Sequence, residues 1–340
     1  MRNAIRKAAG VSVKFHVTPE SEVRAPRILC ATDFSPRSEH AVKRAGMLAM
    51  QLEGELLLLH VVDERQAMNM IGRRADRARS VLQQQVRHLA HLDASTSEIS
   101  VRVGKPHQTI AQVAKEWDAD LVVLGAYRAR TADRFLGTTA ERVVQAATRP
   151  VLIVNHEPTQ DYGSVLLASD LSEGFARIAR MTHDLGLLDG ARASVVHAVG
   201  RDEAMVLASV GVSETEIGRY LRELRISSSN ELLSQFEQAG LDASRFAVFP
   251  RHQTPFRAIE GAVERSAAEL VVVGMTGYRA LKRALGISVS NEVLRKIACD
   301  VLIASPETVL GKQRGSSLGY RKPDFAHAGM NPEASSASLR

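Results

Sequence analysis

Short apolar runs alternate with amphipathic stretches through the central part of the chain. The runs at 28–32, 56–62, 121–124 and 151–154 are rich in Val, Ile and Leu, as buried strands are. After the first run, Ser35-Pro36 is a typical helix start, and apolar residues then recur at helical spacing. Near-continuous apolar strands joined by amphipathic helices predict an α/β fold, with a parallel sheet that helices cover on both faces.

The same pattern occurs twice. Segments 28–35 and 165–172 match at an offset of 137 residues, whereas 119–125 and 268–274 match at an offset of 149. The larger offset indicates an insertion of twelve residues in the second copy, around positions 202–215. The chain therefore contains two tandem copies of one folding unit.

The repeat predicts a domain at 27–155 and a second domain at 163–305. The flanking segments 1–26 and 306–340 have no apolar periodicity and contain Pro, Gly and Ser, so we expect disordered tails. The first of these tails is basic.

The excess positive charge lies in the tails. The chain has a formal net charge of +6, yet positions 28–306 carry no net charge, so the body needs no nucleic acid partner. No apolar run approaches the ~20 residues that span a membrane, and no apolar leader marks the N-terminus. The two cysteines, Cys30 and Cys299, exclude a disulfide scaffold and fit a reducing compartment. We expect a cytoplasmic protein without a membrane partner, and only the basic tails are left as a site of weak association with nucleic acid.

A glycine-containing loop after the fourth predicted strand of each copy is the strongest candidate site. The P-loop, zinc-protease and paired-cysteine motifs are absent from the sequence. In such loops, glycines let backbone N–H groups approach phosphate oxygens, and the helix that follows adds its dipole. Three cations in each loop also favour an anion: Arg128, Arg130 and Arg134, then Arg279, Lys282 and Arg283.

Three segments of the first copy, 31–36, 119–125 and 137–143, together resemble the universal stress protein (UspA-like) family. The resemblance extends over both predicted domains. It implies a five-stranded parallel sheet in each, with strand order 3-2-1-4-5. It also implies that the domains pack as a pseudo-symmetric pair through their fifth strands, 151–154 and 301–304. The number of chains in the assembly stays open, a homodimer included.

The resemblance implies a stress-response protein that binds ATP or a related adenine nucleotide with little or no turnover. A Mg²⁺ ion could accompany the nucleotide, and neither a catalytic residue nor a protein metal site is predicted. Asp33 and Asp170 would face adenine or its ribose. The full set of implied nucleotide-binding residues is Asp33, Val62, Gly125, Arg128, Gly137, Thr138 and Thr139 in the first copy, and Asp170, Gly274, Gly277 and Ser288 in the second.

The two loops depart differently from the pattern G-x2-G-x9-G-[S/T] of nucleotide-binding members. The first copy keeps Gly137-Thr138 but has Arg128 at the second glycine, and its loop is one residue shorter. The second copy keeps its first two glycines and Ser288 but has Ile287 at the third glycine. A β-branched side chain fills space that a phosphate needs. We therefore expect binding mainly in the first domain.

Other interpretations are left open. One alternative function is a nucleotide-independent module whose paired domains bind other proteins, and another is an enzyme of the wider adenine-nucleotide hydrolase-like group. Several site residues also have structural interpretations. These are helix capping by Asp33 and Asp170, a capping box of Thr138 with Glu141, and hydrogen-bonded core histidines at His60 and His197.

Overall fold

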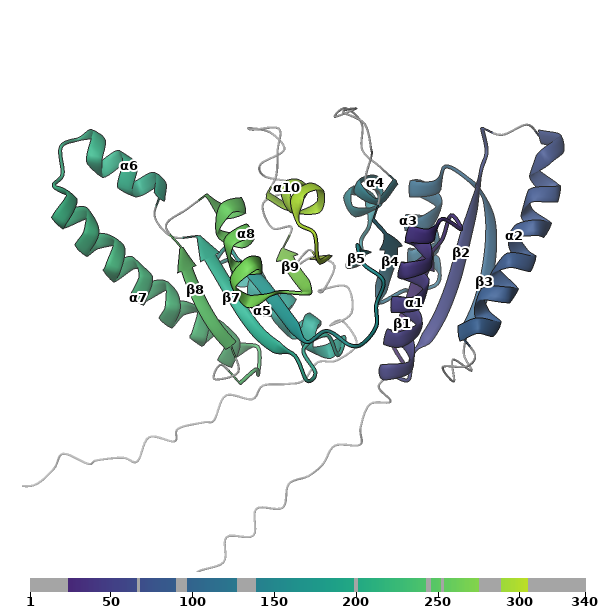
Figure 1. The fold of residues 1–340 in the computed structure, drawn as a ribbon, viewed down its shortest axis with the longest axis horizontal. Helices are drawn as coiled ribbons and strands as arrows, with labels where there is room; N and C mark the ends of the chain where they lie inside the picture. The colour runs from purple at the N-terminus through teal and green to yellow at the C-terminus, as the bar shows by residue number, and fades with distance from the viewer. Residues whose placement is uncertain are drawn as a thin grey trace, which may run out of the picture.

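The computed structural model describes residues 24–65, 68–89, 97–126, 139–198, 201–242, 246–251, 254–274 and 289–304. Apart from 24–26, the expected tails lie outside these residues. The described chain forms one ten-stranded sheet with helices on both faces (Figure 1). None of its helices is long and apolar enough to cross a membrane.

The first half alternates strands and helices. Its strands are β1 (Arg27–Ala31), β2 (Glu55–Asp63), β3 (Ser97–Gly104), β4 (Leu121–Gly125) and β5 (Val151–Val154). Its helices are α1 (Pro36–Gln51), α2 (Met68–Leu89), α3 (Pro106–Glu116) and α4 (Thr139–Ala146). A proline in the first turn starts both α1 and α3, where a missing N–H breaks no helical hydrogen bond.

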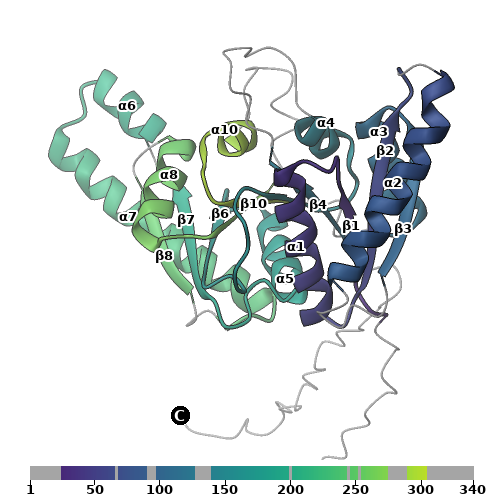
Figure 2. The same ribbon diagram turned by 45° about the vertical axis from the view of Figure 1, so that its right-hand side comes forward.

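The second half repeats this order with one addition. Its strands are β6 (Ser164–Ser169), β7 (Arg192–Ala198), β8 (Phe246–Arg251), β9 (Leu270–Gly274) and β10 (Asp300–Ala304). Its helices are α5 (Glu173–Asp184), α6 (Arg201–Ser209), α7 (Glu214–Gln238), α8 (Pro255–Ser266) and α10 (Val289–Lys296). The predicted insertion corresponds to α6 and the start of α7, where the first half has α2 alone. Both helices lie at the outer end of the second half (Figures 1 and 2).

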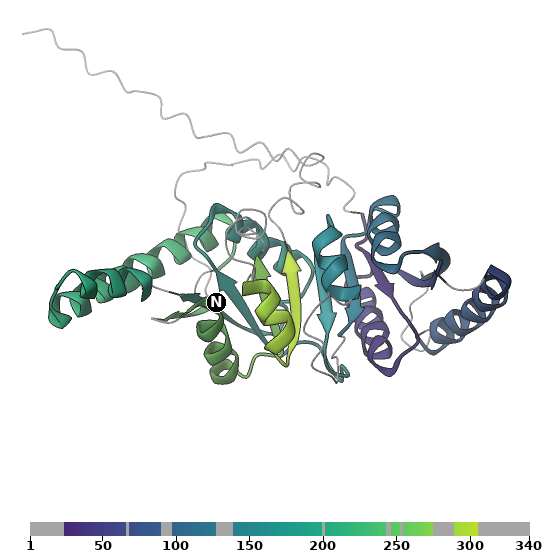
Figure 3. The same cartoon turned by 90° about the horizontal axis from the view of Figure 1, so that it is seen from above.

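The strands run in the order β3-β2-β1-β4-β5-β10-β9-β6-β7-β8, so each half has the order 3-2-1-4-5. The two five-stranded halves meet through their fifth strands, the strands that the sequence placed at the contact, and so form one continuous sheet. There β5 pairs antiparallel with β10 (Figure 3), and Leu152 lies opposite Leu302. Both strands would otherwise be sheet edges with unpaired backbone groups, and pairing satisfies them.

The strands are buried on both faces because helices cover each face. Ile28 and Cys30 of β1 belong to one apolar cluster with residues of α1, α2, α5 and α7. Leu29 and Ala31 belong to a second cluster with residues of α3, α4, α8 and α10. This alternation explains why the strands read as nearly continuous apolar runs.

The antiparallel junction separates the two expected sites. Strands within each half are parallel, whereas β5 and β10 run in opposite directions. The carboxyl ends of the strands of the two halves therefore lie at opposite edges of the sheet. Each half has its own candidate site.

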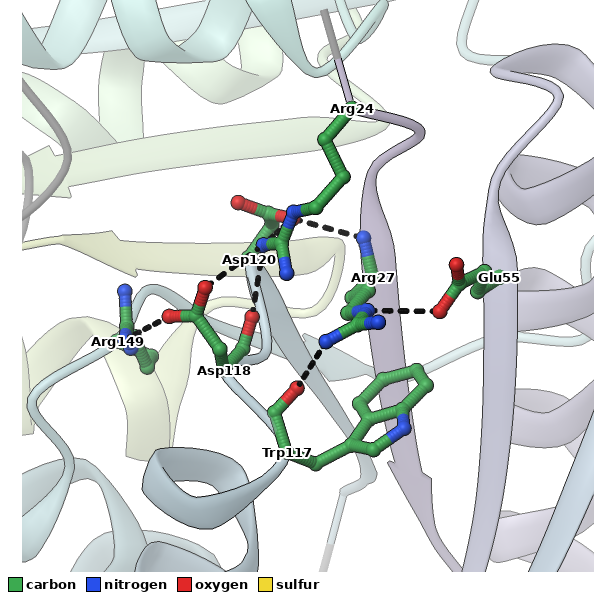
Figure 4. A network of polar contacts seen from close by, with 7 residues as sticks. All are labelled: Arg24, Arg27, Glu55, Trp117, Asp118, Asp120 and Arg149. Atoms are coloured by element: carbon green, nitrogen blue, oxygen red, sulfur yellow. Dashed lines mark hydrogen bonds and ion pairs between the residues drawn. The ribbon is translucent and has the colours of Figure 1, made fainter. Parts of the chain in front are cut away.

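A polar network at the amino ends of β1 and β4 holds residues that the sequence placed in the N-terminal tail (Figure 4). The Arg24 guanidinium lies 3.0 Å from Asp118 and 3.3 Å from Asp120. The Pro26 carbonyl accepts a hydrogen bond from the Glu55 amide at 2.8 Å. The structured part of the chain thus begins by residue 24.

Candidate functional site

The candidate site of the first half lies where β2 extends beyond β1. The register of these strands ends at Ala31 opposite Leu59, while β2 continues alongside β3 as far as Asp63. The end of β2 therefore stands beside the loop that follows β1. Val62 lies in this extension and is buried.

The loop after β1 has a fixed backbone conformation. The Ser35 amide donates to the Asp33 carboxylate at 3.0 Å, and the Phe34 amide donates to the Thr32 hydroxyl at 3.0 Å. Phe34 has a φ of 65°, which is strained for a residue with a bulky side chain. The Ser35 hydroxyl then accepts from the Ser38 amide at 3.3 Å and caps α1. These bonds fix the position of Asp33 just after β1.

The corresponding loop of the second half repeats this geometry. The Ser172 amide donates to Asp170 at 3.0 Å, and the Leu171 amide donates to the Ser169 hydroxyl at 3.1 Å. Leu171 also has a positive φ, of 58°. The two loops therefore place Asp33 and Asp170 in equivalent positions, and both aspartates are exposed.

Asp33 carries its negative charge over the physiological pH range. Burial tends to raise the pKa of this carboxyl, but hydrogen bonds from Ser35 and Ser38 outweigh burial and bring the pKa below its usual value. The aspartate is thus an acceptor for ligand hydroxyl or amino groups.

Two histidines support these loops. Nδ1 of His60 lies 2.9 Å from the Thr32 carbonyl, and Nδ1 of His197 lies 2.9 Å from the Ser169 carbonyl. A carbonyl only accepts, so Nδ1 carries the proton in both rings. The Phe34 ring also stacks on His60, with 4.3 Å between ring centroids. Burial lowers the pKa of His60, against the raising effects of the Thr32 carbonyl and the Asp33 charge. Both histidines are hydrogen-bonded to the main chain, the structural role that the sequence favoured.

Gly125, at the end of β4, has a packing requirement of its own. A Cβ atom there would lie 2.6 Å from the Arg37 carbonyl oxygen and 2.8 Å from the Ser38 amide nitrogen. The first turn of α1 therefore packs directly on β4, which only glycine permits. The sequence assigned this glycine to phosphate binding, and the structure gives a reason for it that needs no ligand.

The helix that follows the glycine loop begins at Thr139, which is exposed. Glu141 in the first turn of this helix, α4, is almost buried and accepts a hydrogen bond from Arg295 of α10 at 2.7 Å. The predicted residues Arg128, Gly137, Thr138, Gly277 and Ser288 lie outside the described residues. Gly274 ends β9, opposite Ala304 of β10.

Comparison with known proteins decides the family. The model of the universal stress protein family matches residues 25–155 and again 161–305. This chain belongs to the universal stress protein family. The two matches coincide with the two halves of the sheet, so the chain has two universal stress protein domains in tandem.

The relatives agree with this assignment. Universal stress protein G of Salmonella typhimurium is 33% identical over 127 residues, which are 34% of this chain and 88% of that protein. A crystal structure of a universal stress protein from Archaeoglobus fulgidus covers 82% of this chain and 98% of its own, with a TM-score of 0.58 and 18% identity. That second likeness concerns the fold. A universal stress protein solved in complex with cAMP is 25% identical over 39% of this chain and 98% of its own, with a TM-score of 0.34.

The two universal stress protein domains thus bring Asp33, Val62 and Gly125 to one sheet edge, and Asp170 and Gly274 to the other. Sequence reasoning missed the part played by Phe34 and Ser38, whose contacts shape the first loop. The repeated order Asp-Phe-Ser and Asp-Leu-Ser was the available signal, because an aspartate two residues before a serine favours a local turn. Among the described residues, no group of three or more His, Cys, Asp or Glu side chains is arranged to hold a metal ion.

Proposed function

We propose that this universal stress protein binds ATP or a related adenine nucleotide, with little or no turnover, mainly through its first domain. The observation that carries the proposal is Asp33. Its carboxylate is ionised, exposed and held by Ser35 beside the extended end of β2. A fixed acceptor at the carboxyl edge of a parallel sheet is where such folds bind nucleotides.

The chain offers distinct surroundings for the two ends of the nucleotide. The Asp33 carboxylate and the backbone at Val62 would hold the adenosine end, where hydroxyl and amino groups donate hydrogen bonds. The phosphate end would lie at the start of α4, where Thr139 begins the helix and Gly137-Thr138 precede it. Backbone N–H groups and a helix dipole favour an anion there. A bound Mg²⁺ ion would be held by the phosphates.

Turnover is not part of the proposal because none of the described residues at this edge has an assigned role in proton transfer or nucleophilic attack. Nδ1 of His60 is hydrogen-bonded to the Thr32 carbonyl, and the Phe34 ring stacks on one face of the imidazole. The Cys30 thiol is fully buried, and burial raises its pKa far above the usual value. It therefore stays protonated and unreactive.

The domain preference rests on the third glycine position. Gly137 would leave room for a phosphate before α4, whereas the sequence has the branched residue Ile287 at the equivalent position before α10. The loss of two charge-assisted hydrogen bonds, at ~1.5–3 kcal/mol each, would weaken binding by orders of magnitude. We expect about one nucleotide per chain.

Isothermal titration calorimetry with ATP tests the proposal. Gly137→Val should abolish binding, Ser288→Ala should leave it unchanged, and Ile287→Gly should add or strengthen a second site. Two equal sites in the wild-type protein, or binding that survives Gly137→Val, would contradict the preference for the first domain. An absence of binding to the wild-type protein would contradict the function itself.

The two aspartates provide a matched pair of variants. Asp33→Ala and Asp170→Ala each remove a carboxylate that accepts a hydrogen bond at 3.0 Å from the amide of the serine two residues later. The two variants should therefore lose similar amounts of folding stability. Only Asp33→Ala should reduce ATP affinity, by about ten- to a hundredfold for one lost hydrogen bond to a charged group. Equal reductions would argue against a single site in the first domain.

A second candidate function, protein binding without nucleotide, is favoured by the surface of α6 and the turn that follows it. Met205, Val206 and Val210 are exposed by 60%, 62% and 71%, and they lie in the insertion that the first domain lacks. Exposed apolar groups of this kind mark interaction surfaces. If calorimetry finds no nucleotide binding, replacement of these three residues by serine should abolish co-purification of a partner protein without lowering the melting temperature.

A further inference from the structure

The junction of the two domains has an approximate twofold symmetry, visible in the pairing of β5 with β10. Leu152 lies opposite Leu302, and Val151 lies opposite Ile303, so positions 150 residues apart are equivalent. The helices α4 and α10 start at Thr139 and Val289, which follow the same offset. Any contact across this junction has a symmetry-related counterpart whose residues can be read from the sequence.

One side of the junction contains a buried ion pair. The Arg44 guanidinium of α1 lies 3.9 Å from the Asp300 carboxylate at the start of β10, and both side chains are more than nine-tenths buried. Arg44 also donates to the Gln160 carbonyl at 2.9 Å and lies over the Tyr162 ring. The Asp300 carboxylate accepts from the Tyr162 hydroxyl at 2.6 Å and from the Asn155 amide at 2.7 Å.

Tyr162 acts in this cluster as a neutral donor. Burial and the Asp300 charge raise the pKa of Tyr162 well above its usual value, so its hydroxyl keeps its proton. The cluster therefore contains one cation, one anion and the segment between the domains. Removal of either charge leaves the other buried without a partner of opposite sign.

A second ion pair lies on the other face of the sheet. Nε of Arg295 on α10 donates to Glu141 on α4 at 2.7 Å. The Glu141 side chain is 11% exposed, whereas Arg295 is half exposed. The helices α4 and α10 lie next to each other above the junction (Figures 1 and 2).

Each of the two ion pairs occurs only once across the twofold axis. The counterparts of Arg44 and Asp300 are Met181 and Pro150, and the counterparts of Glu141 and Arg295 are Asn291 and Gln145. The symmetry-related positions therefore carry no charge. The apolar strands of the junction match each other symmetrically, whereas these two ion pairs do not.

We propose that these two one-sided ion pairs make the junction selective for unlike domains, so that each chain closes on itself and not through a like domain of a second chain. In a pair of first domains, Arg44 would face Pro150 and Glu141 would face Gln145. In a pair of second domains, Asp300 would face Met181. The first like pairing would bury Arg44 without its carboxylate and the second would bury Asp300 without its cation, whereas the apolar strands alone would accept either.

A double-mutant cycle on the full chain tests whether the Glu141–Arg295 ion pair stabilises the junction. Glu141→Arg and Arg295→Glu should each lower the melting temperature by about 2–4 °C, and the double variant should recover most of the loss. Asp76→Arg makes the same charge change in an exposed pair with Arg79 inside the first domain, and it should have no comparable effect. Additive losses in the double variant would overturn the proposal.

Co-refolding tests whether the ion pair between α4 and α10 selects the partner domain. The single variants Glu141→Arg and Arg295→Glu carry complementary charges, so two chains, one of each, can exchange domains and restore both ion pairs. Differently tagged variants refolded together from urea should give mixed dimers in several-fold excess over tagged and untagged wild-type chains refolded together. Mixed dimers at the wild-type level would overturn the proposal.

The buried pair provides an independent measurement. Arg44→Met introduces the counterpart residue of the second domain and leaves the buried Asp300 charge without its cation. Asp300→Asn in the same chain should recover part of the lost melting temperature because no buried charge then remains. A double variant that is less stable than Arg44→Met would count against a role for this pair.

Discussion

At the scale of single residues, the structure separates packing requirements from ligand requirements. Gly125 is needed because the first turn of α1 lies against β4, whatever the ligand. Asp33 has no such packing requirement, because its carboxylate is exposed. Its local hydrogen bonds fix its position and leave it accessible to a ligand. Both residues lie at one sheet edge, yet substitutions at them should have different consequences.

Gly125→Ala should destabilise the protein in the absence of nucleotide. The new Cβ would collide with backbone atoms of Arg37 and Ser38, so we expect a loss of about 1–3 kcal/mol in chemical denaturation. Gly72→Ala is the matched control, because no atom lies within 4 Å of its Cβ position in α2. Alanine there should stabilise the helix by about 0.5–1 kcal/mol. A Gly125→Ala variant with wild-type stability would refute the close approach of α1 to β4.

His60 should make stability depend on pH. Burial places its pKa below the usual 6.5, so the folded state binds fewer protons than the unfolded state. Its contribution to stability is full above pH 6.5 and is lost as the pH falls through the folded pKa. The melting temperature of His60→Gln should therefore fall less on acidification than that of the wild-type protein. His197→Gln controls for the loss of an equivalent ring. If the melting temperature of His60→Gln depended on pH as strongly as that of the wild-type protein, the prediction would be contradicted.

At the scale of elements, the two domains use the same loop but start the following helix differently. The Ser35 hydroxyl accepts a hydrogen bond from the Ser38 amide and caps α1. Ser172 occupies the same position before α5 but makes no such bond, and its hydroxyl is buried without a partner among the described residues. Equivalent serines in the two copies therefore stabilise the helices that follow them to different extents.

Ser35→Ala should lower the stability by about 0.5–2 kcal/mol, the usual contribution of a helix N-cap. Ser172→Ala should change it by less than about 0.5 kcal/mol, because no hydrogen bond is lost. Thermal melts of both variants test this difference. Equal losses would show that the two caps are equivalent in solution.

At the scale of the whole molecule, contacts of residues 24–26 show how much of the N-terminal segment belongs to the first domain. The Arg24 ion pairs and the Pro26 carbonyl tie the start of the chain to Asp118, Asp120 and Glu55. The network lies at the amino ends of β1 and β4 (Figure 4), whereas the candidate site lies at the carboxyl ends of these strands. The expected dispensable tail is therefore shorter than the sequence suggested.

A chain of residues 24–306 should melt at the temperature of the full chain, whereas one of residues 27–306 should melt lower. The shorter chain loses one backbone hydrogen bond and an ion-pair network, together about 1–2 kcal/mol. For domains of this size, that loss corresponds to about 2–4 °C per kcal/mol. Identical melting temperatures would show that residues 24–26 contribute nothing.

Much of the fold and part of the site could be predicted from the sequence by itself. The alternation of apolar strands and amphipathic helices, the two copies and the insertion depend on periodicity over a few residues and on self-similarity. The placement of Asp33 and Gly125 at a strand end follows from the same local signals. These features needed no knowledge of which distant segments meet.

Only the tertiary structure decided the rest. The register of β5 against β10, the close approach of α1 to Gly125, and the contacts of Arg44 with Asp300 and Glu141 with Arg295 join residues far apart in the chain. A residue's own neighbours in sequence do not specify such contacts. They arise because edge strands pair where their backbone groups would otherwise stay unbonded, and because a buried charge is stable only where the fold brings an opposite charge to it.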